Sequence, residues 1–150
     1  MQRIPWSLLL LLTLALSWPA GPALAEEDDR ALTAEEESAF QAELASFQRE
    51  LAQYLKSRTR GGLAAGGPTM FENNFSGSGK SSSLSHAFKE AQREVQAGVD
   101  GWMNSLGQQG YAPVDPPPPQ QSIKTKWGIS GFKFYARIKL NLKIWCQKMN

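Results

Sequence analysis

Four consecutive prolines, Pro116–Pro119, divide the chain into two parts of opposite charge. Residues 26–115 carry fourteen acidic and eight basic side chains, whereas residues 116–150 carry seven basic side chains and no acidic one. A proline run forms a stiff, extended spacer because proline lacks the backbone N–H that helices and sheets use. We therefore expect a Pro-rich spacer at 108–121, with independent behaviour on its two sides. The abrupt change also suggests that the tail comes from an alternative exon or a retained intron, as in a splice variant.

The supply of apolar side chains limits the size of any core. Leu, Ile, Val and Phe account for only 23 of the 125 residues from 26 to 150, a proportion at which disorder becomes a serious candidate. The small net charge of +2 argues against complete disorder. These numbers predict a mainly α fold with much disorder, and at most one small domain.

Residues 1–25 have the three parts of a secretory signal peptide. Arg3 supplies positive charge, residues 8–18 form an apolar stretch, and residues 23–25 give a small-x-small cleavage pattern. As a helix the apolar stretch would cover about 16 Å, roughly half of a ~30 Å hydrocarbon core. We expect a secreted, extracellular protein that is not transmembrane after cleavage and begins with an acidic leader at 26–33.

An amphipathic helix is predicted at 34–60. Thr33 and Glu36 have the spacing of a capping box, and Gly61 follows the last polar turn. Between these signals, five apolar residues are spaced 4, 3, 4 and 3 apart, which is the heptad period of a helix–helix seam. We predict that they contact a partner: Phe40, Leu44, Phe47, Leu51 and Tyr54.

Residues 61–83 contain six glycines and five serines, a composition typical of a flexible linker. Asn74-Phe75-Ser76 is an acceptor sequence for N-glycosylation. Because a secreted, glycine-rich loop would expose this sequence, we predict a glycoprotein modified at Asn74.

A second amphipathic helix is predicted at 84–107. Its apolar residues recur with a mean spacing near 3.67, which suits an ordinary amphipathic helix better than a left-handed coiled coil. The predicted partner contacts on this stripe are Phe88, Val95 and Trp102.

The basic, aromatic tail at 122–150 has a different period. From Phe132 to Trp145, apolar residues alternate with largely basic ones, as in a strand buried on one face. The run exceeds the usual strand length of about 3–10 residues, and we identify neither an internal turn nor a partner strand. Its structure is therefore left uncertain, but its cations predict contact with an anionic surface: Lys133, Arg137, Lys139 and Lys143.

Cys146 is the only cysteine of the chain. In a secreted protein, a single thiol forms an intermolecular disulfide or stays free. A third interpretation, equally weighted, is an incidental residue in a flexible terminus.

One histidine and one cysteine offer few catalytic combinations, so we predict no catalytic residue, no metal and no cofactor. Two unpartnered stripes favour a small, non-enzymatic interaction protein that docks its helices on a protein partner or on a second copy. The alternatives are binding of anionic lipid or sulfated glycan through the basic tail, or a secreted precursor cut near residues 56–60. Nucleic acid is not an expected ligand of a secreted protein.

Overall fold

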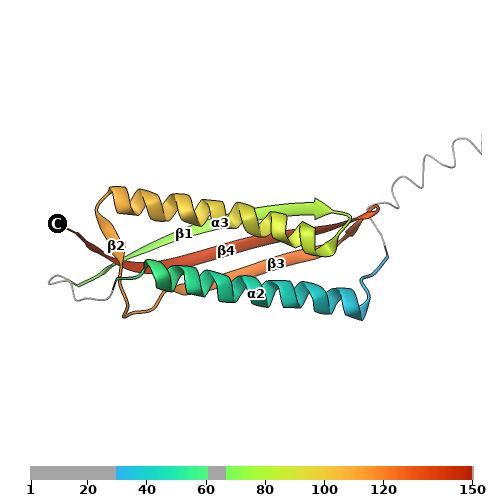
Figure 1. The fold of residues 1–150 in the computed structure, drawn as a ribbon, viewed down its shortest axis with the longest axis horizontal. Coiled ribbons are helices and arrows are strands. Elements are labelled where there is room, and N and C mark those ends of the chain that lie inside the picture. The colour runs from blue at the N-terminus through green and yellow to red at the C-terminus, as the bar shows by residue number, and fades with distance from the viewer. Residues whose placement is uncertain (1–29, 61–66, 150) are drawn as a thin grey trace, which may run out of the picture.

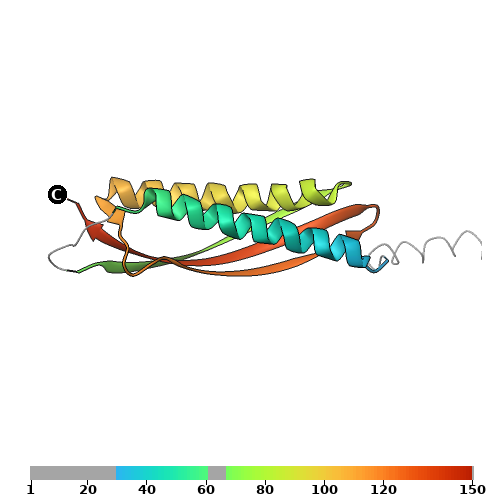
Figure 2. The same ribbon diagram turned by 60° about the horizontal axis from the view of Figure 1, so that its bottom comes forward.

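The computed structural model describes residues 30–60 and 67–149, so the predicted signal peptide and the first part of the leader lie outside it. Helices α2 (Ala34–Arg58) and α3 (Leu84–Gln108) lie side by side on one face of a four-stranded antiparallel sheet (Figure 1). Turning the molecule shows that no described element covers the other face (Figure 2). The fold is α+β, and the prediction of a mainly α fold with much disorder is wrong.

The sheet is built around one long strand that follows the proline run. This strand, β4 (Lys133–Lys148), pairs along one edge with β1 (Thr69–Ser81). Along its other edge it pairs with β3 (Gln120–Ser130) and then with the short β2 (Tyr111–Pro113). Every partner strand is antiparallel to β4.

The predicted basic tail contains a hairpin. Ser130 pairs with Lys133 across Gly131 and Phe132, and Gly131 has a positive φ of 66°. A two-residue connection with glycine first is one of the favoured hairpin turns because its backbone twist matches that of the strands. The expectation that the tail lacks a turn and a partner strand is therefore wrong.

The glycine- and serine-rich segment predicted to be a flexible linker forms strand β1 over thirteen residues. The glycines are required by packing, because α3 crosses close to this strand. A Cβ atom at Gly77 would overlap the carbonyl oxygen of Ala91, and one at Gly79 would overlap that of Ala87. The predicted Pro-rich spacer likewise contains β2 and the first residues of β3.

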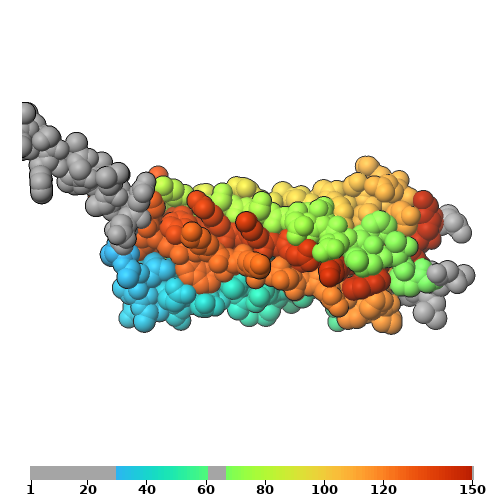
Figure 3. Space-filling model, turned by 180° about the vertical axis from the view of Figure 1, so that it is seen from behind, coloured from blue at the N-terminus to red at the C-terminus, as the bar shows by residue number. Residues whose placement is uncertain are grey.

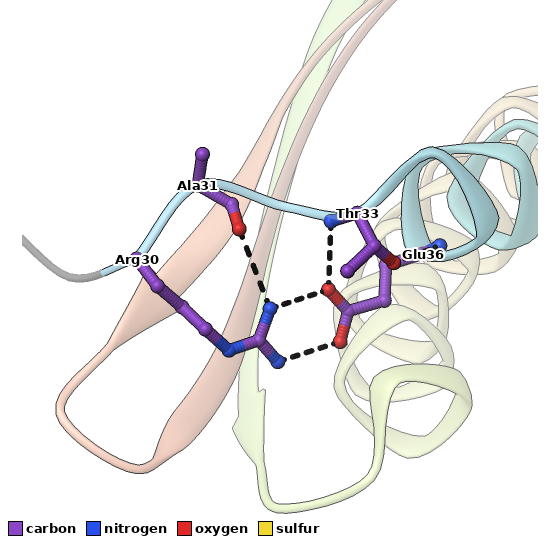
Figure 4. A network of polar contacts seen from close by, with 4 residues as sticks. All are labelled: Arg30, Ala31, Thr33 and Glu36. Carbon is purple, nitrogen blue, oxygen red and sulfur yellow. Dashed lines mark hydrogen bonds and ion pairs between the residues drawn. The ribbon is translucent and has the colours of Figure 1, made fainter.

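Helix α2 begins with the predicted capping box (Figure 4). The Thr33 hydroxyl accepts a hydrogen bond from the Glu36 N–H at 3.0 Å, and the Glu36 carboxylate accepts one from the Thr33 N–H at 2.9 Å. Both carboxylate oxygens also accept from the Arg30 guanidinium at 2.7 Å. The Arg30 bonds and the Thr33 bond lower the pKa of Glu36 to about 2. The helix ends at Arg58, two residues before the predicted end.

Helix α3 confirms the second predicted helix almost to the residue. It starts at Leu84, as expected, and ends at Gln108, one residue beyond the predicted end. Ser83 caps it, since its hydroxyl accepts from the His86 N–H at 3.4 Å.

The apolar core lies between the two helices and the inner face of the sheet. The stripes of α2 and α3 face alternate residues of β4, and many of these side chains have no exposed surface: Phe40, Phe47, Leu51, Phe88, Val95, Val99, Ile138, Leu142 and Ile144. Burying a side chain of this size stabilises the fold by about 1.5–3 kcal/mol. Because β4 supplies six of the seventeen buried residues of this core, the predicted independence of the segments on either side of the prolines is wrong.

Candidate anion-binding face

Seven basic side chains project from the open face of the sheet, which we call the basic face. Successive strand residues point to opposite faces, and directly paired residues point to the same face. In β4 the even-numbered positions from 136 to 146 are buried against the helices, so the odd-numbered ones point outward together with their partners on β1 and β3. Figure 3 looks onto this face, where β1 (green), β4 (red) and β3 (orange) lie side by side. Its cations are Lys80, Lys124, Lys126, Lys133, Arg137, Lys139 and Lys143.

Two cross-strand pairs at the centre of the basic face join like charges. Lys124 of β3 lies directly opposite Lys139 of β4, and Lys126 lies directly opposite Arg137. Opposite residues on a sheet have Cβ atoms about 4.5–5.5 Å apart, and like charges in that position are destabilising. The two pairs are neighbours, because two residues along a strand cover about 6.7 Å. Four positive charges are therefore concentrated in a small area.

Of the seven cations of the basic face, only Lys143 lies directly opposite an acidic residue, Glu72 of β1. Glu72 is the only acidic residue in strands β1, β3 and β4, and its carboxylate accepts a hydrogen bond from the Asn141 side chain at 2.8 Å. Within residues 30–60 and 67–149 the close contacts between basic and acidic side chains are Arg30–Glu36 and His86–Glu90, both outside the sheet. The basic face consequently presents a positive potential to solvent.

Two adjacent hollows lie on the basic face. The first, which we call the basic hollow, has a volume of about 470 Å³ and is lined by Lys80, Lys126, Ser130, Tyr135 and Arg137. The second, which we call the amide hollow, has a volume of about 400 Å³, and its polar lining is Asn74, Ser76, Ser122, Lys124, Lys139 and Asn141. Together they offer ammonium and guanidinium groups next to amides and hydroxyls, a combination suited to a ligand with both anionic and neutral polar groups.

The structure brings the four cations predicted to contact an anionic surface onto this one face. Lys133, Arg137 and Lys139 are exposed, and Lys143 is half-buried. Sequence reasoning did not assign Lys80 to this surface, because its strand was interpreted as a linker. The available signal was the alternation of glycine with serine and lysine over residues 76–80, which repeats the two-residue period of a strand.

The residues predicted to contact a partner through the helices face the protein's own sheet instead. Five of them are fully buried: Phe40, Phe47, Leu51, Phe88 and Val95. The other three are half-buried and pack against the same core: Leu44, Tyr54 and Trp102. This corrects the prediction, since the apolar stripes are already covered and offer no docking surface.

Cys146 lies at an inward position of β4 and has no exposed surface. Burial raises the pKa of its thiol to about 11. An intermolecular disulfide is one of the interpretations that the sequence leaves open, and the buried position argues against it in the folded protein.

Asn74 lies in the middle of β1 rather than in a flexible loop. It occupies an outward position, is exposed, and pairs across the sheet with Asn141. Glycosylation at Asn74 stays a prediction, now with a defined place on the basic face.

No three His, Cys, Asp or Glu side chains in the described ranges are arranged to hold a metal ion. Neither described helix combines the length and the apolar character needed to cross a membrane. Comparison with known proteins finds no matching family model, no similar curated protein and no similar solved structure.

Proposed function

We propose that this chain is a small secreted, non-enzymatic protein that binds linear sulfated glycans through its basic face. The observation that carries the proposal is the direct opposition of Lys124 to Lys139 and of Lys126 to Arg137. In the free protein these pairs oppose folding, whereas sulfate groups placed between them would turn repulsion into attraction. Cations next to an anionic surface contribute about 1 kcal/mol each.

The chemistry of the face favours a glycan over a lipid bilayer. The amide hollow supplies Asn and Ser side chains, which can hydrogen-bond to sugar hydroxyls and carboxylates. Within the described residues, the exposed large apolar side chains are Met70, Phe132 and Met149, at the ends of β1, the hairpin and β4. The centre of the face thus lacks the apolar groups that amphipathic surfaces insert between lipids.

A pair of charge-matched variants tests the proposal. The basic-face variant combines Lys124→Gln, Lys126→Gln, Arg137→Gln and Lys139→Gln. The helix-face variant removes the same charge from exposed positions on the opposite side, with Arg49→Gln, Lys56→Gln, Lys89→Gln and Arg93→Gln. The native chain and both variants are produced without N-glycans. Their binding to immobilised heparin is measured over a series of salt concentrations, because each released counterion steepens the dependence of affinity on salt.

We expect the basic-face variant to lose most heparin affinity and much of the salt dependence, and the helix-face variant to keep both. The basic-face variant should unfold at the same or a higher urea concentration than the native chain, because two repulsive pairs have been removed. Equal losses in the two variants would show that net charge alone drives binding and would overturn the proposal. Tighter binding of anionic vesicles or duplex DNA than of heparin would overturn the assignment of the ligand class.

A further inference from the structure

We propose that N-glycosylation of Asn74 blocks the basic face, so that the protein exists as a masked, glycosylated form and an active, unglycosylated form. This inference rests on the proposed function, because it concerns regulation of the same surface. Three observations support it: the orientation of the Asn74 amide, its place beside the paired lysines, and the order in which the strands are synthesised.

The Asn74 side chain presents the atom that carries a glycan. Its carbonyl oxygen accepts a hydrogen bond from the Asn141 amide at 2.9 Å, which fixes the orientation of the group. Its own amide nitrogen, Nδ2, makes no hydrogen bond within the described residues. Since Asn74 is exposed on the outer face, a sugar on this nitrogen extends into solvent without displacing the core.

A glycan at this position would occupy the surface that binds anions. Asn74 lines the amide hollow together with Lys124 and Lys139. The first sugars attached to Nδ2 would therefore lie over the hollow and separate these two ammonium groups from an incoming polyanion. The basic hollow lies along the same strands, so the outer sugars of a branched glycan would shield it as well.

The chain order leaves the acceptor open during synthesis. Among the strands of residues 30–60 and 67–149, only β4 pairs with β1, and β4 is made after α3, β2 and β3. At about 5–20 residues per second, Asn74 spends seconds as unpaired chain before its partner strand exists.

In this period Nδ2 can attack the anomeric carbon of a polyisoprenyl-diphosphate-linked oligosaccharide. A C–N bond forms, the bond from that carbon to the diphosphate oxygen breaks with the lipid diphosphate leaving, and the transferase takes up the amide proton.

The test compares native chain secreted from eukaryotic cells with two variants that lose the acceptor sequence by different changes. Asn74→Gln keeps an amide opposite Asn141, and Ser76→Ala leaves Asn74 itself unchanged. Because both residues line the amide hollow, the native sequence produced in bacteria without a glycan supplies the reference affinity of the unglycosylated face. Variants are preferable to enzymatic release, because hydrolysis of the glycan leaves an aspartate and adds negative charge to the face. In the matched control, Ser57→Asn is added to Asn74→Gln, which places a new acceptor sequence in the last turn of α2, on the helix side.

We expect the secreted native chain to carry a glycan and to bind heparin about thirtyfold more weakly than both unglycosylated variants, the loss that corresponds to about two cations. The control, glycosylated on the helix side, should bind as tightly as Asn74→Gln. A native chain without a glycan, or one that binds as tightly as the variants, would overturn the inference and leave the proposed function intact. Failure of the unglycosylated native sequence to bind heparin would instead overturn the proposed function, and this inference with it.

Discussion

The indole ring of Trp127 lies flat on the phenyl ring of Phe40, with ring centroids 5.1 Å apart and planes only 4° from parallel. The indole N–H also donates to the Glu37 carboxylate at 3.0 Å. Phe40 and Glu37 belong to the first helix, whereas Trp127 follows the proline run. This contact joins the acidic and basic parts of the chain in one core.

A double-mutant cycle should detect this connection. We expect Phe40→Leu and Trp127→Leu to be coupled by about 0.5–1.5 kcal/mol in the free energy of unfolding, the range for paired aromatic rings. Urea unfolding of the native chain, the two single variants and the double variant gives the value.

Phe40→Leu with Trp102→Leu is the control. Trp102 lies about 21 Å further along α3 than Phe88, a neighbour of Phe40, so their effects should add. Additive effects in the first cycle would contradict the packing described here.

Removing the chain after Asp115 should abolish cooperative folding. The truncation deletes β3 and β4, and with them the inner face against which both helices pack. The exposed stripes could still form partial helix, but without a fixed tertiary structure. Near-ultraviolet circular dichroism and thermal unfolding measure the effect, and a sharp unfolding transition in the truncated chain would contradict it.

Substitution of the β1 glycines tests the close approach of α3. Gly79→Ala should destabilise the protein by about 1–3 kcal/mol, because the new methyl group meets the Ala87 carbonyl and forces strand and helix apart. Gly101→Ala is the matched control, since this helical glycine has open space beside it and alanine favours a helix by about 1 kcal/mol. The two changes should therefore shift the urea midpoint in opposite directions. Equal tolerance of both would mean that α3 does not lie close to β1.

The helices could be predicted from sequence because their signals are local. The capping box at Thr33 and Glu36 and the 3.5–3.67 spacing of apolar residues depend only on neighbours a few positions away. The sheet could not be predicted in the same way. The second half of strand β1 contributes Gly77 and Gly79 where other strands contribute large apolar residues, so this part of its inner face carries little hydrophobic signal. The segment can be recognised as a strand only when the position of helix α3, which packs against its glycines, is known.

Only part of the candidate site could be predicted, because only part of it depends on local signals. Alternation placed Arg137 and Lys139 on one face of a single strand, which is a local property. Their pairing with Lys126 and Lys124 depends on the hairpin register set at Gly131, and that register requires two strands to be recognised. The apolar stripes were interpreted as a docking surface because the strand that covers them was not assigned to the same domain.

The Cys146 thiol should be unreactive in the folded protein. Its pKa is raised to about 11 by burial, so at pH 8 it is both protonated and inaccessible to reagents. Because the folded pKa lies above that of the unfolded chain, this group adds stability below about pH 8.5 that is lost as the pH rises toward 11. Reaction with a thiol reagent should be slow in buffer and complete within the dead time in urea. Rapid labelling under native conditions, or a covalent dimer in the secreted protein, would contradict the buried position.

The central claim of this account is that the open face of the sheet binds anions. The most direct test is whether heparin protects individual lysines from chemical modification. Unglycosylated protein is acetylated briefly with and without a heparin oligosaccharide, and mass spectrometry gives the modification rate at each lysine. We predict slower acetylation at Lys80, Lys124, Lys126 and Lys139 when the oligosaccharide is present. Lys56 and Lys89, on the helix side, should react at an unchanged rate. Equal protection of all lysines, or protection confined to the helix side, would contradict the account.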